Sequence, residues 1–206
     1  MRSPGTPAGL GAAISRLARR IPVGAVYLAG LVPVAALGIE ALVAGLGADP
    51  VKRIEHALGL AALQFLLAGL AITPLLRFAG VNLMRFRRAL GLVAFGLAAA
   101  HLAVWVTLDL QFRWSEIAAD LTRRPYIIAG MAAFALLVPL AATSSDSALR
   151  RLGALRWRRI HRLVYPAVLL GALHHLLTFK VPTPEAFAYL GLACGLVALR
   201  LLPRRG

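Results

Sequence analysis

Residues 89–110 read ALGLVAFGLAAAHLAVWVTLDL, and residues 163–179 read LVYPAVLLGALHHLLTF. Each stretch is a continuous apolar run close to the roughly 20 residues that an α-helix needs to cross the hydrocarbon core of a membrane. Each also carries histidine inside the run, at His101 in the first and at His174 and His175 in the second. The two stretches therefore predict membrane-spanning helices that hold imidazole groups at membrane depth.

Four further apolar stretches accompany these two. They cover residues 21–46, 57–76, 126–142 and 186–202. All the runs are continuous and rich in Ala and Leu instead of alternating, which favours helices over the strands of a membrane β-barrel. We therefore expect an all-α membrane protein, a bundle of about six transmembrane helices. Its membrane domain would be residues 21–202, preceded by a cytoplasmic segment 1–20 and followed by a cytoplasmic tail 203–206.

The composition agrees with a membrane protein. Hydrophobic residues make up 60% and charged residues 15% of the 206 residues, against about half and about a quarter in soluble domains. The net charge of +15 does not indicate nucleic-acid binding, because the arginines cluster between apolar runs, as topology signals do. The single cysteine, Cys194, lies inside the last run and excludes an internal disulfide.

The basic residues also predict the orientation. In a six-helix arrangement, 17 of the 23 lysines and arginines lie in the N-terminal segment, the loops 77–88 and 150–162, and the C-terminus, which all share one side. Basic residues are enriched on the cytoplasmic side of membrane proteins. We therefore expect both termini in the cytoplasm, with the basic face in contact with anionic membrane lipid.

The histidines are the candidate functional residues, because imidazole is costly in hydrocarbon and is a common axial ligand of haem iron. His101 follows Arg88 by 13 residues and His174 follows Arg162 by 12 residues. At the helical rise per residue, both lie about 20 Å from the cytoplasmic edge, in the outer half of the bilayer. Two facing helices with histidine at one level can hold one haem from both faces. Small residues near both positions, such as Gly96 and Gly171, would let a flat macrocycle approach the backbone.

The other three histidines have weaker signals. His161 falls at the cytoplasmic boundary in RWRRIHRLVY, and the inner end of the facing run, RFRR, has no histidine to pair with it. The open alternatives for His161 are a haem ligand with a different partner, a contact to a haem propionate, flavin or quinone headgroup, or an interfacial histidine. His175 points about 100° away from His174 on a helix, and His56 begins its run beside Arg53 and Glu55, so both are weaker candidates.

Four stretches resemble one family of proteins. They are residues 54–77, IEHALGLAALQFLLAGLAITPLLR, residues 87–102, RRALGLVAFGLAAAHL, residues 123–144, RRPYIIAGMAAFALLVPLAATS, and residues 151–180, RLGALRWRRIHRLVYPAVLLGALHHLLTFK. Together they resemble the MsrQ (YedZ) family, the haem-bearing membrane subunits of the MsrPQ system, within the ferric-reductase-like transmembrane group. The match covers most of residues 54–180.

The resemblance implies a function. It implies b-type haem with His101, His161 and His174 as iron ligands, where His175 leaves open which imidazole of the pair binds. It also implies FMN, electrons drawn from quinol, and a periplasmic molybdopterin-containing partner, MsrP, that reduces methionine sulfoxide in proteins. The chain would be a multi-pass protein of the bacterial inner membrane that transfers electrons and performs no substrate chemistry itself.

Two other classes stay open. A small proton-coupled channel or transporter would use Glu40, the one acid inside an apolar run, together with the histidines. A non-redox assembly factor would use the histidines only for packing.

Overall fold

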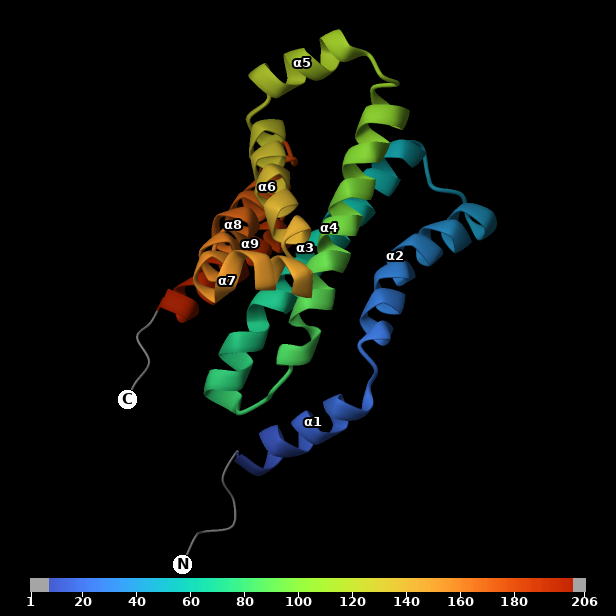
Figure 1. The fold of residues 1–206 in the computed structure, drawn as a ribbon. Coiled ribbons are helices and arrows are strands. Elements are labelled where there is room, and N and C mark those ends of the chain that lie inside the picture. The colour runs from blue at the N-terminus through green and yellow to red at the C-terminus, as the bar shows by residue number, and fades with distance from the viewer. Residues whose placement is uncertain (1–7, 202–206) are drawn as a thin grey trace, which may run out of the picture.

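The computed structural model describes residues 8–201, and these residues form helices without any strand (Figure 1). The elements are α1 Ala8–Arg20, α2 Gly24–Val43, α3 Pro50–Ala79, η1 Met84–Phe86, α4 Arg87–Val104, η2 Trp105–Asp109, α5 Trp114–Arg123, α6 Pro125–Ala142, α7 Asp146–His161, α8 Val164–Leu177 and α9 Pro184–Leu201. η1 is a 3-10 turn, and η2 is a π-helical turn that continues α4. The predicted tail 203–206 and the first seven residues of the predicted segment 1–20 lie outside the described residues.

Five helical segments of the described chain are long and apolar enough to cross a membrane. They are Gly24–Val43, Pro50–Ala79, Met84–Asp109, Pro125–Ala142 and Asp146–Leu177. The all-α multi-pass architecture is therefore confirmed. The described part of the sixth predicted stretch, residues 186–201 of 186–202, lies in α9, which packs against α3 and α8. Six crossings and the orientation of the termini stay predictions.

The centre of the molecule is a bundle in which α3 packs on α4, α6 packs on α8, and α9 packs on both α8 and α3. Its core contains one cluster of buried aliphatic side chains that includes Leu66 and Leu70 of α3, Leu137 of α6, Val168 of α8 and Leu196 of α9. Apolar side chains also cover the outside of the helices: Leu28, Leu31 and Leu42 of α2 are each more than 60% exposed. Such a continuous apolar exterior suits hydrocarbon as the surrounding medium.

Local signals in the sequence set several helix ends. Asp49 accepts a hydrogen bond from Lys52 N at 3.0 Å, and Pro50 follows it at the first helical position of α3. α3 ends at Gly80, whose φ of 67° is the left-handed conformation that glycine adopts most easily. Pro125 begins α6 in the same way that Pro50 begins α3. These local signals set where α3 and α6 begin and where α3 ends.

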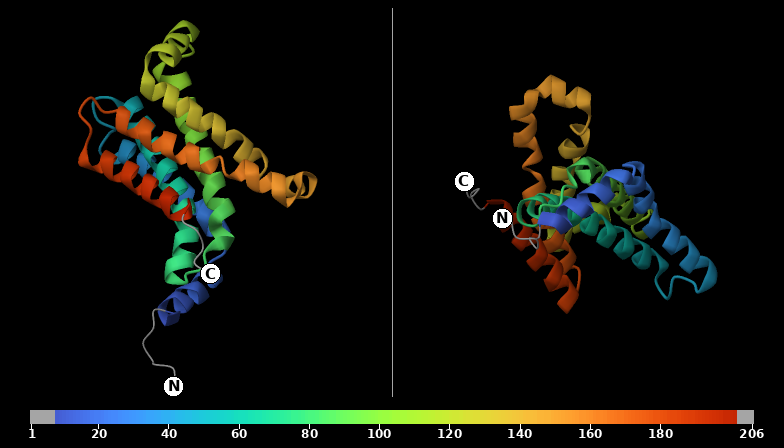
Figure 2. Two further views of the ribbon diagram at one scale, coloured as in Figure 1. Left: turned by 90° about the vertical axis from the view of Figure 1, so that its left-hand side faces the viewer. Right: turned by 90° about the horizontal axis from the view of Figure 1, so that it is seen from below.

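The structure differs from the sequence-based expectation in the connections. The predicted loop 150–162 is mostly helical and belongs to α7, which begins where Ser145 accepts a hydrogen bond from Ala148 N at 3.1 Å. α7 is broken at Gly153, whose φ of 71° and ψ of 156° are not helical, and it projects from the ends of α6 and α8 (Figure 2). The connection between α4 and α6 contains the short helix α5. Figure 1 places α5 at the end of the bundle opposite α1.

Candidate functional site

The imidazole rings of His101 on α4 and His174 on α8 face each other inside the bundle. Their ring centroids are 6.0 Å apart, and the ring planes are inclined by 71°. The structure therefore places at one level two side chains that lie more than 70 residues apart in the sequence. This shared level is the one expected from counting residues along the two helices.

A backbone carbonyl orients each ring. His101 Nδ1 lies 2.8 Å from the carbonyl oxygen of Glu55 on α3, and His174 Nδ1 lies 2.7 Å from the carbonyl oxygen of Tyr126 on α6. A carbonyl oxygen only accepts, so each Nδ1 carries a hydrogen and donates it, and each Nε2 keeps its lone pair. This is the arrangement in which metal-ligating histidines are held in proteins. Sequence reasoning missed both carbonyls, because main-chain groups leave no residue-type signal.

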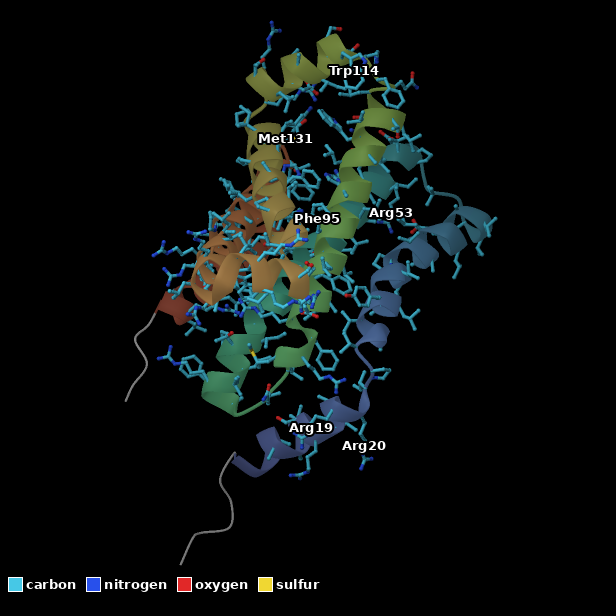
Figure 3. The ribbon with its side chains drawn as sticks, in the orientation of Figure 1. Arg19, Arg20, Arg53, Phe95, Trp114 and Met131 are labelled. Atoms are coloured by element: carbon cyan, nitrogen blue, oxygen red, sulfur yellow. The ribbon has the colours of Figure 1, made fainter. Side chains whose placement is uncertain are left out.

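A cavity of about 460 Å³ lies beside the two rings, between α3, α4, α6 and α8. Its walls away from the rings are mostly apolar and include Leu63, Leu66, Ala98, Leu137 and Gly171. Phe134 of α6 also lines the cavity and stacks on Phe95 of α4, with ring centroids 5.6 Å apart and planes inclined by 12°. Phe95 is labelled in Figure 3, where it lies on the side of α4 that faces α6. An apolar cavity with two convergent imidazole groups is the usual form of a cofactor site.

The end of the cavity near α5 is polar. Lys52 Nζ lies 3.0 Å from Glu55 Oε2 and 2.6 Å from Asp109 Oδ2, so it joins α3 to η2. Glu55 is buried, and its other carboxylate oxygen, Oε1, has no hydrogen-bond partner among the described residues. Lys52, Asp109 and Arg124 also line a second chamber of about 350 Å³ under α5.

Arg124 closes this end between α5 and α6. It donates a hydrogen bond to the Tyr126 hydroxyl at 3.1 Å and lies 2.8 Å from Asp120. The hydrogen bond to Tyr126, followed by the nearby Asp120 carboxylate, raises the pKa of Arg124 above its ordinary value. The guanidinium therefore stays charged at neutral pH, as arginine does in proteins generally.

His175 and His56 do not face the His101–His174 pair, although both border the cavity. The His175 ring contacts Phe179 at 5.4 Å and Tyr189 of α9 at 5.6 Å, both edge to face. His56 is exposed, and its ring centroid lies 6.1 Å from that of Phe179. Of the two neighbouring histidines on α8, it is therefore His174 that meets His101.

His161 lies apart from this cavity, at the junction of α7 and α8. Its ring stacks on Trp157 at 3.9 Å, and its Nε2 lies 3.2 Å from Thr143 Oγ1. The Thr143 hydroxyl donates its hydrogen to the Pro139 carbonyl at 2.6 Å, so Nε2 is the donor to Thr143. A metal at His161 would therefore have to displace Thr143 or bind through Nδ1.

Glu40, the candidate for a proton path, pairs with an arginine. Arg53 Nε and Nη2 donate to its two carboxylate oxygens at 2.9 and 2.8 Å, and Figure 3 shows Arg53 on the side of α3 facing α2. Among residues 8–201, no three His, Cys, Asp or Glu side chains gather as a metal site. The opposed imidazole pair is thus the feature of the described chain best suited to bind a metal-containing group.

Known proteins that resemble this chain establish the class of protein to which it belongs. Residues 56–172 match the family of ferric reductase like transmembrane components, a segment that contains His101, His161 and the cavity wall of α6. The chain is 46% identical to the protein-methionine-sulfoxide reductase heme-binding subunit MsrQ of Rhizobium meliloti over 89% of this chain and 84% of that protein. It is 43% identical to the MsrQ proteins of Agrobacterium fabrum and Brucella anthropi, covering 87% and 85% of this chain and 83% and 80% of theirs. The chain belongs to the MsrQ family, as the four quoted stretches predicted.

Proposed function

We propose that this chain is the membrane electron-transfer subunit of a protein-methionine-sulfoxide reductase and holds a b-type haem between His101 and His174. One observation carries the proposal: two opposed imidazoles, each tied at Nδ1 to a backbone carbonyl of the neighbouring helix. The related MsrQ proteins are named as heme-binding subunits of that reductase, which supports the same assignment here.

The spacing of the two rings suits this group. A metal atom bound to two imidazole nitrogens at about 2 Å each lies between ring centroids that are about 6 Å apart. The centroids of His101 and His174 are 6.0 Å apart. Two imidazoles do not complete a metal site by themselves, so the remaining ligands would come from the group that enters the cavity. Haem is a group that would bring those remaining ligands with it.

Each part of the cavity has a role in this function. A bound haem supplies a one-electron couple whose potential depends on its axial ligands, its burial and the nearby charge. His101 and His174 would bind its iron, and the carbonyls of Glu55 and Tyr126 keep both rings oriented. The apolar walls and the Phe95–Phe134 stack would keep water away from the bound group. The Lys52 and Arg124 clusters contribute the charge at the outer end.

The direction of transfer belongs to the same proposal. Quinol in the bilayer gives the electrons, and a periplasmic molybdopterin-containing subunit, MsrP, accepts them and reduces methionine sulfoxide. The chain then lies in the bacterial inner membrane with both termini in the cytoplasm and α5 at the periplasmic face. The distribution of basic residues supports this orientation, and α5 lies at the opposite end of the bundle from α1.

His161 and FMN complete the proposal at the inner end of the bundle. His161 either binds haem, as a third histidine beside His101 and His174, or contacts FMN or quinol. The family resemblance implies such a role. Its neighbourhood supports electron entry there, because Trp157 offers an aromatic face and the half-buried cation Arg87 lies nearby. Nδ1 of His161 is the nitrogen left with a lone pair by the contact with Thr143.

The test is an optical spectrum of the detergent-purified protein, oxidised and then reduced with dithionite, with a pyridine haemochrome assay. We expect b-type haem in the wild-type protein and the loss of one haem per chain in His101→Ala and in His174→Ala. His56→Ala is the matched control, because His56 is an exposed histidine at the edge of the same cavity. It should keep the full haem content.

Two outcomes would contradict the proposal. Full haem content in both His101→Ala and His174→Ala would reject the ligand pair. A colourless wild-type protein, expressed with ample haem, would reject the redox class and favour a transporter or an assembly factor. Flux of protons into vesicles would then separate those two classes.

A further inference from the structure

Each of the two facing histidines packs against a glycine on a neighbouring helix. A Cβ atom added at Gly59 of α3 would lie 3.2 Å from His101 Nδ1 and 3.3 Å from its Cε1. A Cβ atom added at Gly130 of α6 would lie 2.7 Å from His174 Nδ1 and 3.0 Å from its Cε1. The His174 ring therefore occupies the space that a side chain at Gly130 would fill, and the His101 ring would have to give way by a few tenths of an ångström to a side chain at Gly59.

The two contacts have the same arrangement. Gly59 comes four residues after Glu55, and Gly130 comes four residues after Tyr126. Residues four apart lie on the same face of a helix, one turn above the other. Each ring thus meets the same two features of its neighbouring helix: a carbonyl oxygen that accepts from Nδ1, and one turn along, a Cα without a side chain.

Helix geometry alone does not call for glycine at these positions. Both lie inside long helices, where glycine is unfavourable relative to alanine. Other glycines near the site have no such contact: a Cβ at Gly96, five residues before His101 on α4, would meet no atom within 4 Å, and one at Gly171 would meet only Leu63, at 4.0 Å. The glycines that touch the rings are therefore not those that stand beside the histidines in the sequence.

We propose that Gly59 and Gly130 are positioning residues that seat the His101 and His174 imidazoles and so set the rotation of the two ring planes at the haem iron. This inference rests on the haem-binding function proposed above. The bare Cα lets each ring lie flat against the helix while Nδ1 reaches the carbonyl. A methyl group would push the ring aside, weaken that hydrogen bond and turn the ring plane. Ring orientation and the Nδ1 hydrogen bond both tune a ligated metal.

The first test measures the haem itself in full-length protein. Gly59→Ala, Gly130→Ala and the control Gly96→Ala are compared with the wild type by haem content, redox titration and the low-spin electron paramagnetic resonance signal, which depends on the angle between the axial ring planes. Gly96→Ala should match the wild type, because Gly96 is exposed and does not line the cavity, which corrects the expectation that it lets the macrocycle approach the backbone. Gly59→Ala should keep haem with a shifted signal and potential, and Gly130→Ala should show a larger shift or a loss of haem, because its contact is 0.5 Å closer.

The outcomes separate this inference from the proposed function. A wild-type protein without haem contradicts the function. A wild-type protein with haem, together with Gly59→Ala and Gly130→Ala variants that match Gly96→Ala in content, signal and potential, overturns the role of the glycines and leaves the function standing.

The second test works even where Gly130→Ala folds poorly or loses its haem. It measures thermal unfolding in detergent for Gly130→Ala in the wild-type background and in a His174→Ala background, as a double-mutant cycle. If the methyl group clashes with the imidazole, Gly130→Ala lowers the Tm only when His174 is present. An equal loss of Tm in both backgrounds would mean that the ring is not what Gly130 accommodates, and would overturn the inference at this position.

Discussion

Replacing Lys52 by methionine should destabilise the outer end of the bundle. Lys52 Nζ is the partner of Glu55 Oε2 at 3.0 Å and of Asp109 Oδ2 at 2.6 Å. The Glu55 side chain is only 7% exposed, and its Oε1 has no partner among the described residues. Methionine keeps most of the length and apolar stem of lysine, so the substitution removes the charge and the hydrogen bonds with little loss of volume.

The magnitude follows from burial. Breaking a fully buried ion pair destabilises a protein by about 3–5 kcal/mol, because the remaining charge stays desolvated. Lys52 is 43% exposed and Asp109 is 26% exposed, so solvent screens part of the loss and we expect about 2 kcal/mol. For a chain of about 200 residues this corresponds to a fall in Tm of about 4–8 °C. Because the Glu55 carbonyl holds His101, a shift of the haem spectrum should accompany this fall in Tm.

The assay is thermal unfolding of the detergent-purified protein, followed by intrinsic fluorescence. Arg53→Met is the control, because Arg53 is the next residue and pairs with Glu40 where the two side chains are 48% and 33% exposed. A solvent-exposed pair contributes about 0–1 kcal/mol. The double variant Lys52→Met/Glu55→Gln should recover most of the lost stability. A Tm for Lys52→Met equal to that of Arg53→Met would refute the reasoning.

Three further predictions concern α7, the contact between His174 and Tyr126, and the topology. Gly153→Ala should destabilise α7 by about 1–3 kcal/mol, because the φ of 71° and ψ of 156° at Gly153 belong to a region that only glycine occupies easily. Limited proteolysis should then cut faster within residues 150–162, and an unchanged cleavage rate would contradict the prediction. Tyr126→Phe should leave haem content unchanged, because His174 bonds to the main-chain carbonyl; haem loss would show that the hydroxyl matters. In a Cys194→Ser background, an impermeant thiol reagent should label Ser115→Cys from the periplasm and Ser147→Cys only after lysis, and the reverse pattern would contradict the orientation.

The sequence alone predicted most of the architecture of the bundle. Continuous apolar runs predict helices wherever hydrocarbon is the solvent, since backbone polar groups must then be satisfied within the helix. Counting residues from the last arginine of each run placed His101 and His174 at one depth. The connections were harder to predict from the sequence, because α7 and α5 are short polar helices whose formation depends on capping and on docking against the ends of the spans.

Within the candidate site, residue types and their depth were readable from the sequence, whereas contacts between helices were not. Hydropathy and charge determined that the chain is a multi-pass membrane protein with imidazoles inside its spans. Only the tertiary structure decided that His174, and not His175, meets His101, and that the carbonyls of Glu55 and Tyr126 and the bare Cα atoms of Gly59 and Gly130 receive the two rings. The physical reason is that these contacts depend on how each helix is rotated and shifted against its neighbour. Helix packing sets that geometry, and the atoms it brings together are main-chain atoms that every residue carries.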